Sequence, residues 1–79
     1  MEHTVTVYST PTCSWCQLAK DHLNGHGISF DDIDVSTDMS RAREMVEKSG
    51  QYGVPVIDID GEIIVGFDRH RIDSLLGIN

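Results

Sequence analysis

The stretch PVIDIDGEIIVGF, residues 55–67, predicts a β-hairpin and with it the pairing of the last two strands. Two arms rich in β-branched residues flank Asp60-Gly61, a dipeptide that favours the type I′ turn of tight hairpins. Because a connection of two residues joins antiparallel strands, these two arms must pair in that direction. Both arms carry apolar residues on both faces, which indicates a sheet covered by helices on its two sides.

Ahead of the hairpin, two strand patterns alternate with helix patterns. Residues 4–8 (TVTVY) and 28–35 (ISFDDIDV) have the composition and alternation of strands. Between them, residues 14–24 carry apolar side chains at helical spacing, and the Asn24-Gly25 pair ends that helix. A right-handed crossover through this helix makes the first two strands parallel.

Two further helices complete the element order. One is predicted over residues 40–50, with Asp38 or Ser40 as its cap, and the other over residues 68–77. The order β-α-β-α-β-β-α predicts a single α/β domain over residues 1–79, folded as a three-layer sandwich around a four-stranded mixed sheet. A chain of this length buries one modest core and has no room for a second domain.

The composition excludes several classes of function. The net charge of -7, from 13 acidic and 6 basic residues, makes nucleic acid an unfavourable partner because phosphates repel such a surface. No apolar run is long enough to span a bilayer, and the first ten residues lack the basic and apolar segments of a secretory signal. We therefore expect a cytoplasmic protein with no membrane partner, in a compartment where a permanent disulfide is rare.

Cys13 and Cys16, within TPTCSWC at residues 10–16, are the two cysteines of the chain. Cys13 falls where the first loop meets the first helix, and the unpaired N–H groups and partial positive charge of a helix start favour a thiolate there. Cys16 lies one turn further along, within bonding distance of Cys13 but less exposed. The spacing predicts an accessible nucleophile and a resolving thiol that exchange disulfides with a substrate.

Two other interpretations of the cysteine pair remain open. A zinc or iron–sulfur site needs four ligands, of which the pair supplies two. His22 and His26 could complete the set, but only five residues separate Cys16 from His22, and both histidines are expected on the helix surface beyond the thiols. An inert buried pair is the other interpretation. A redox pair is favoured over both because the motif lies beside a β-α-β pattern, and no bound metal or organic cofactor is expected.

Three segments together resemble the glutaredoxin family of the thioredoxin fold: TPTCSWC before a helix, GVPV at residues 53–56, and GFDRHRI at residues 66–72. The resemblance runs from the first strand to the last helix. It implies a thioredoxin-like fold and thiol–disulfide oxidoreductase activity, with roles in electron transport and redox homeostasis. In that family the proline matching Pro55 follows a cis peptide bond beside the nucleophilic cysteine. The residue before it, here Val54, pairs its backbone with the substrate.

Several residues depart from the members of the family that use glutathione. Trp15 replaces the tyrosine between the cysteines, and we expect it to be exposed, either as a contact for a protein substrate or packed over Pro11. Thr10 stands where the family has a lysine that meets a glutathione carboxylate. Arg69 and His70 stand where the family has two acids that meet the glutathione ammonium, so charge complementarity for glutathione is reduced at both ends.

The last segment, GFDRHRIDSLL at residues 66–76, is similar instead to that of NrdH-type redoxins, the glutaredoxin-like electron donors of ribonucleotide reductase. The resemblance places Gly66 and Phe67 in the substrate-binding surface, although Phe67 fits the core as well. It implies that the substrates are protein disulfides, including that of ribonucleotide reductase. The electron source it implies is a thioredoxin-reductase-type flavoprotein, with glutathione as the alternative. We expect the protein to act as a monomer.

Overall fold

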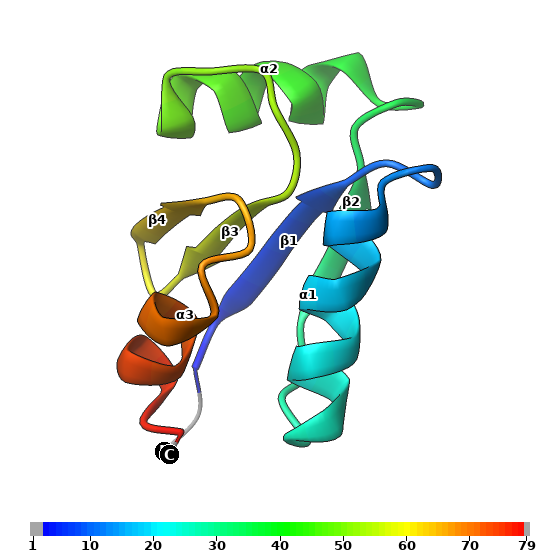
Figure 1. The fold of residues 1–79 in the computed structure, drawn as a ribbon. Coiled ribbons are helices and arrows are strands. Elements are labelled where there is room, and N and C mark those ends of the chain that lie inside the picture. Colours follow the sequence, from blue (N-terminus) through cyan, green and yellow to red (C-terminus); the bar gives the residue numbers. More distant parts are fainter. Residues whose placement is uncertain (1–2, 79) are drawn as a thin grey trace.

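The computed structural model describes residues 3–78 of the chain and has the predicted order of elements. Strands and helices alternate up to the hairpin, and a helix follows it (Figure 1). The elements are β1 (Val5–Ser9), α1 (Ser14–Gly25), β2 (Asp31–Asp34), α2 (Met39–Ser49), β3 (Val56–Ile59), β4 (Glu62–Val65) and α3 (Arg69–Leu76). No helix within residues 3–78 combines the length and the apolar character needed to cross a membrane.

The strands of the described chain form one mixed sheet in the order β2-β1-β3-β4. β1 runs parallel to β2 and antiparallel to β3. β3 and β4 form the predicted hairpin, in which Asp60 and Gly61 have φ values of 53° and 93°. Positive φ at both central residues is what a type I′ turn requires. The mixed sheet and its hairpin are therefore confirmed.

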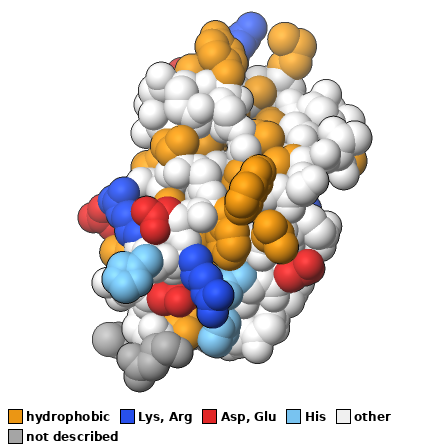
Figure 2. Space-filling view, viewed as in Figure 1, with side chains coloured by type: hydrophobic (Ala, Val, Ile, Leu, Met, Phe, Trp, Pro, Cys, Tyr) orange, Lys and Arg blue, Asp and Glu red, His pale blue; other side chains and the backbone are white. Residues whose placement is uncertain are grey.

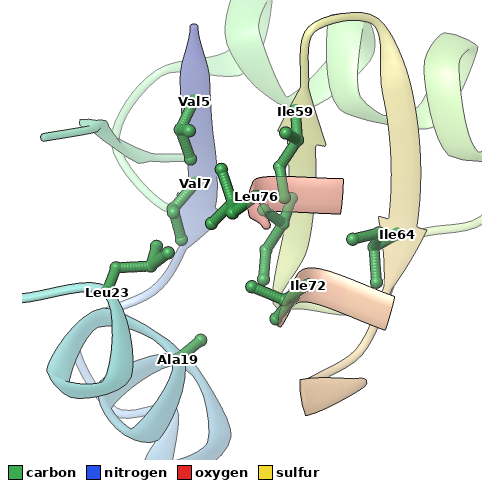
Figure 3. Close-up of a cluster of buried hydrophobic side chains, with 9 residues drawn as sticks. Val5, Val7, Ala19, Leu23, Ile59, Ile64, Ile72 and Leu76 are labelled. Atoms are coloured by element: carbon green, nitrogen blue, oxygen red, sulfur yellow. The ribbon is translucent and has the colours of Figure 1, made fainter. Parts of the chain in front are cut away.

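Helices cover both faces of the sheet, which confirms the three-layer sandwich. The surface view shows hydrophobic side chains along the middle of one side of the molecule, with charged side chains and histidines mostly below them (Figure 2). Inside, α1 and α3 pack on one face of the sheet, where nine side chains form the larger core (Figure 3): Val5, Val7, Ala19, Leu23, Ile57, Ile59, Ile64, Ile72 and Leu76. On the other face, α2 closes a smaller core of Tyr8, Met45 and Val56.

The second strand is shorter than predicted. The sequence pattern predicts a strand over residues 28–35, whereas β2 covers only Asp31–Asp34. Ile28 and Phe30 lie before the strand and pack their side chains against the larger core. A loop that buries every second side chain shows the same alternation of apolar and polar residues as a strand, so the sequence pattern alone does not distinguish the two.

The helix ends follow their capping residues. Asp38 caps α2 by accepting the N–H of Arg41 at 3.1 Å, and Asp68 makes the equivalent bond at the start of α3. Both helices end at glycines in the left-handed conformation, Gly50 and Gly77. α1 begins differently because its N-cap is a cysteine, Cys13, which belongs to the candidate active site.

Candidate active site

Cys13 is the N-cap of α1, as its place in the sequence predicts. Its backbone is extended, with φ of -91° and ψ of 112°, so the helix begins directly after it. The Cys16 N–H donates to Cys13 Sγ at 3.1 Å. This is one of the unpaired N–H groups of the helix start, and a thiolate accepts it better than a thiol does. The half-buried Cys13 side chain therefore has both access to solvent and an N–H donor at its sulfur.

Cys16 lies one turn inside α1 and is only 1% exposed. Burial, and after it the hydrogen bond with the Cys13 side chain, raises the pKa of the Cys16 thiol to about 11. The backbone of Thr10 and the charge of Lys20 act in the opposite direction and lower this pKa. Cys16 is therefore a shielded, protonated thiol at neutral pH.

The loop before β3 brings Val54 and Pro55 against the cysteines. Cys13 Sγ lies 3.9 Å from the Val54 carbonyl oxygen, and the Val54–Pro55 peptide bond is cis, as the resemblance implies. Val54 is half-buried and packs against the core under α2, while Pro55 is buried. The Gly66 N–H donates to the Pro55 carbonyl at 2.8 Å. The segment that follows β4 is thereby tied to the loop beside the nucleophile.

Two aromatic residues predicted for the binding surface have different environments. Trp15 is 63% exposed between the two cysteines, which confirms the expected exposure. Phe67 is half-buried and packs against the larger core, with its ring edge-on to that of His22 at 5.8 Å between centroids. Phe67 is therefore mainly a core residue, and only part of its ring reaches the surface.

An open depression adjoins Cys13 on the side of α1. It holds about 490 Å³, and its lining carries no charged side chain: Pro11, Thr12, Cys13, Ser14, Gln17 and Leu18. Leu18 and the neighbouring Trp15 are 48% and 63% exposed. The surface next to the nucleophile is thus uncharged and partly apolar, in a protein whose net charge is -7. Such a surface suits a peptide segment better than a highly charged small molecule.

The surface position expected for both histidines of α1 is wrong for His22. Its Nε2 lies 2.5 Å from Asp73 Oδ1 of α3, and only 9% of its side chain is exposed. His26 and Phe67 pack edge-on against the His22 ring. The sequence does hold a signal for this burial, because His22 is three residues after the buried Ala19 and shares its helix face.

The histidines do not complete a metal site with the cysteines. His22 faces Asp73 instead of the thiols. Among residues 3–78, no three side chains of His, Cys, Asp or Glu are grouped in a way that could hold a metal ion. Cys13 Sγ instead lies against the backbone of Cys16 and of Val54, with Cys16 one helical turn away, which is an arrangement for exchange between sulfurs.

Iodoacetamide at pH 7 is expected to modify Cys13 at least about tenfold faster than Cys16. Cys16 is buried and its pKa is about 11, so little of it is thiolate at this pH. Mass spectrometry of peptides from timed, quenched reactions measures the two rates. Urea, which removes the burial, should bring the rates together and serves as the control. Faster labelling of Cys16 in the folded protein would reverse the two roles.

Comparisons with known proteins agree with this geometry. The family model described as Glutaredoxin matches residues 5–64. An uncharacterized glutaredoxin-like 8.6 kDa protein in the rubredoxin operon of Clostridium pasteurianum is 50% identical over 72 residues, which are 91% of this chain and 96% of that protein.

Two further relatives carry different names at nearly equal identity. Glutaredoxin 3 of Escherichia coli (strain K12) is 36% identical over 76 residues, or 95% of this chain and 92% of that one. The glutaredoxin-like protein NrdH of Lactococcus lactis is 35% identical over 71 residues, or 90% and 97%. The crystal structure of the thioredoxin-like protein BC3987 superposes with a TM-score of 0.86 at 26% identity, covering 91% of this chain and 99% of that chain.

Proposed function

Because this chain belongs to the glutaredoxin family, whose members are thiol–disulfide oxidoreductases, we propose that it reduces protein disulfides with its cysteine pair. Cys13 is the nucleophile and Cys16 is the resolving thiol. The observation that carries the proposal is the contrast between the two sulfurs: one is accessible and accepts an N–H at the helix start, and the other is buried one turn away. The reaction needs this difference, because the first sulfur must meet the substrate and the second must attack the first.

The proposed reaction has two exchange steps. The Cys13 thiolate attacks one sulfur of the substrate disulfide, that S–S bond breaks, and the released substrate thiolate takes up a proton. The Cys16 thiolate then attacks the Cys13 sulfur of the mixed disulfide, which releases the second substrate thiol. The protein is left with a Cys13–Cys16 disulfide, and two electrons have passed to the substrate.

Residues around the sulfurs support the binding of an extended peptide. The Val54 carbonyl lies 3.9 Å from Cys13 Sγ, so a substrate strand pairing with the Val54 backbone carries its disulfide to the nucleophile. The exposed Trp15 offers a broad apolar contact on one side of this strand. The Gly66 N–H donates to the Pro55 carbonyl, so Gly66 and Phe67 follow directly on the loop that carries Val54, and both belong to the proposed binding surface.

We propose that a thioredoxin-reductase-type flavoprotein, and not glutathione, returns the electrons. The two named relatives, a glutaredoxin at 36% identity and an NrdH protein at 35%, do not distinguish the two donors, whereas individual residues of this chain do. Thr10 offers no cation for a glutathione carboxylate. Arg69 and His70 are both exposed at the start of α3. The family has two acids there for the glutathione ammonium, and neither Arg69 nor His70 offers that ammonium a negative charge. The proposed substrates include ribonucleotide reductase, and the proposed setting is the reducing cytoplasm, with the protein acting as a monomer.

Reduction of insulin by dithiothreitol tests the proposed activity without choosing a physiological donor. The protein is expected to accelerate the precipitation of the insulin B chain at catalytic concentration. Protein alkylated at Cys13 beforehand is the control and should leave the uncatalysed rate unchanged. An untreated protein that gives only the uncatalysed rate would contradict the proposed function.

A further inference from the structure

A nearly buried lysine lies on the same helix face as the resolving cysteine. Lys20 follows Cys16 by four residues in α1, a spacing that places two side chains one above the other. Only 17% of the Lys20 side chain is exposed. Its Nζ lies 3.1 Å from Asp32 Oδ2 and 3.4 Å from Ser9 Oγ. Ser9, itself 2% exposed, donates to Asp32 Oδ1 at 2.9 Å, so three side chains hold one another in place.

The same end of β1 contacts both Lys20 and Cys16. Ser9 contacts the Lys20 ammonium, and the backbone of the next residue, Thr10, lowers the pKa of Cys16. The Thr10 carbonyl also accepts the Cys13 N–H at 3.3 Å, which joins the strand end to the start of α1. The end of β1 therefore joins the Lys20 ammonium, through Ser9, to the start of α1, through Thr10.

We propose that Lys20, held by Asp32 and Ser9, stabilises the Cys16 thiolate in the second exchange step and so sets the rate at which the mixed disulfide is resolved. This inference rests on the proposed function and deepens it. Cys16 loses its proton to solvent, and its thiolate attacks Cys13 Sγ. The bond between Cys13 and the substrate breaks with its electron pair on the substrate sulfur, which then takes up a proton. Lys20 takes no part in these proton transfers and acts through Cys16 as a positioning residue.

The surroundings of Cys16 explain why a nearby cation matters. Burial raises the pKa of this thiol to about 11, even though Lys20 already lowers it. The charge of Lys20 lowers this pKa, although its effect is smaller than that of burial. The other titratable groups that face Cys16, directly or through Lys20, are Cys13, Asp32 and Asp34. All of these are thiols or acids, so the loss of Lys20 removes a positive charge that favours the Cys16 thiolate.

The two steps can be timed separately with dithiobis(nitrobenzoate), a small disulfide that releases a coloured thiolate at each exchange. Attack by Cys13 releases the first equivalent, and resolution by Cys16 releases the second. In Lys20→Met the first phase should be unchanged, and the second should be about three- to tenfold slower at neutral pH. A lost neighbouring charge raises a pKa by roughly 1–2 units, and the greater nucleophilicity of the more basic thiolate offsets about half of this.

The pH profile and a conservative variant provide a readout that a loss of packing would not change. To reach the same second-phase rate, Lys20→Met should need a pH about 0.5–1 unit higher than the unmodified protein does. Lys20→Arg, which keeps the charge, should retain most of the second-phase rate. An equal slowing of both phases in Lys20→Met, or an equally slow second phase in Lys20→Arg, would overturn the inference.

Lys48→Met is the matched control. Lys48 also reaches from a helix to an aspartate on a strand, with Nζ 2.8 Å from Asp58, but it extends from α2 on the other side of the sheet (Figure 1). Both of its phases should match those of the unmodified protein, and a slow second phase in this control would overturn the inference. A normal second phase in Lys20→Met would overturn the inference alone. An unmodified protein without any second phase would overturn the proposed function as well.

Discussion

Cys16→Ser is expected to accumulate a stable mixed disulfide with its substrate, whereas Cys13→Ser accumulates none and reduces insulin only at the uncatalysed rate. Cys13 is the accessible sulfur, so its attack survives the loss of Cys16. Resolution does not survive, because the second sulfur is absent. In Cys13→Ser the remaining thiol is 1% exposed and burial still raises its pKa, so it neither meets a substrate disulfide nor ionises readily.

Non-reducing electrophoresis and intact-protein mass spectrometry measure the trapped species, and dithiothreitol should release it. Because a serine hydroxyl at a position 1% exposed costs about 1–3 kcal/mol if it finds no partner, Cys16→Ala serves as the second variant. It leaves no unsatisfied hydroxyl and should trap the same disulfide. Equal trapping by the Cys13 and Cys16 variants would show that the division of roles is wrong.

Turnover should be efficient with NADPH and a thioredoxin reductase, and about ten- to a hundredfold less efficient with glutathione and glutathione reductase. The expected ratio corresponds to the loss of one charge-assisted contact, about 1.5–3 kcal/mol. Thr10 supplies no charge for the carboxylate of glutathione. Arg69, whose side chain is 69% exposed, reaches Asp73 only at 4.0 Å, so its charge lies open to the ligand where the family has an acid.

The triple variant Thr10→Lys, Arg69→Asp and His70→Asp should raise the glutathione-dependent activity. Acids in the first turn of α3 agree with the positive end of its dipole, so the helix should tolerate them. Arg43→Asp, a charge reversal at an exposed position of α2, controls for the change in net charge and should leave the activity unaltered. Efficient turnover of the unmodified protein on millimolar glutathione, with no response to several thioredoxin reductases, would identify an ordinary glutathione-dependent member of the family.

The order of the elements and the place of the nucleophile could be predicted from the sequence because both depend on residues close together in the chain. Asp60-Gly61 specifies a turn through its own backbone preferences, and Asp38 caps a helix through a residue three positions away. Cys13 and Cys16 are joined by the geometry of a single helical turn. The cis bond at Pro55 was implied by the resemblance and is confirmed.

Only the tertiary structure decided the contacts made between elements. The pattern at residues 28–35 does not show that Ile28 leaves the sheet, because a strand and a packed loop bury alternate side chains alike. His22 finds Asp73 across 51 positions, and Cys13 finds Val54 across 41. Nothing in the neighbouring residues encodes such pairs.

The same limit applies to the charge beside the resolving thiol. The sequence places Lys20 one turn after Cys16. It does not show that the Lys20 ammonium binds Asp32, twelve positions further along the chain. A long, flexible lysine side chain can extend into water or fold against the protein with nearly the same local geometry. Its direction is decided by a partner on a neighbouring strand, and that strand becomes a neighbour only when the sheet has formed.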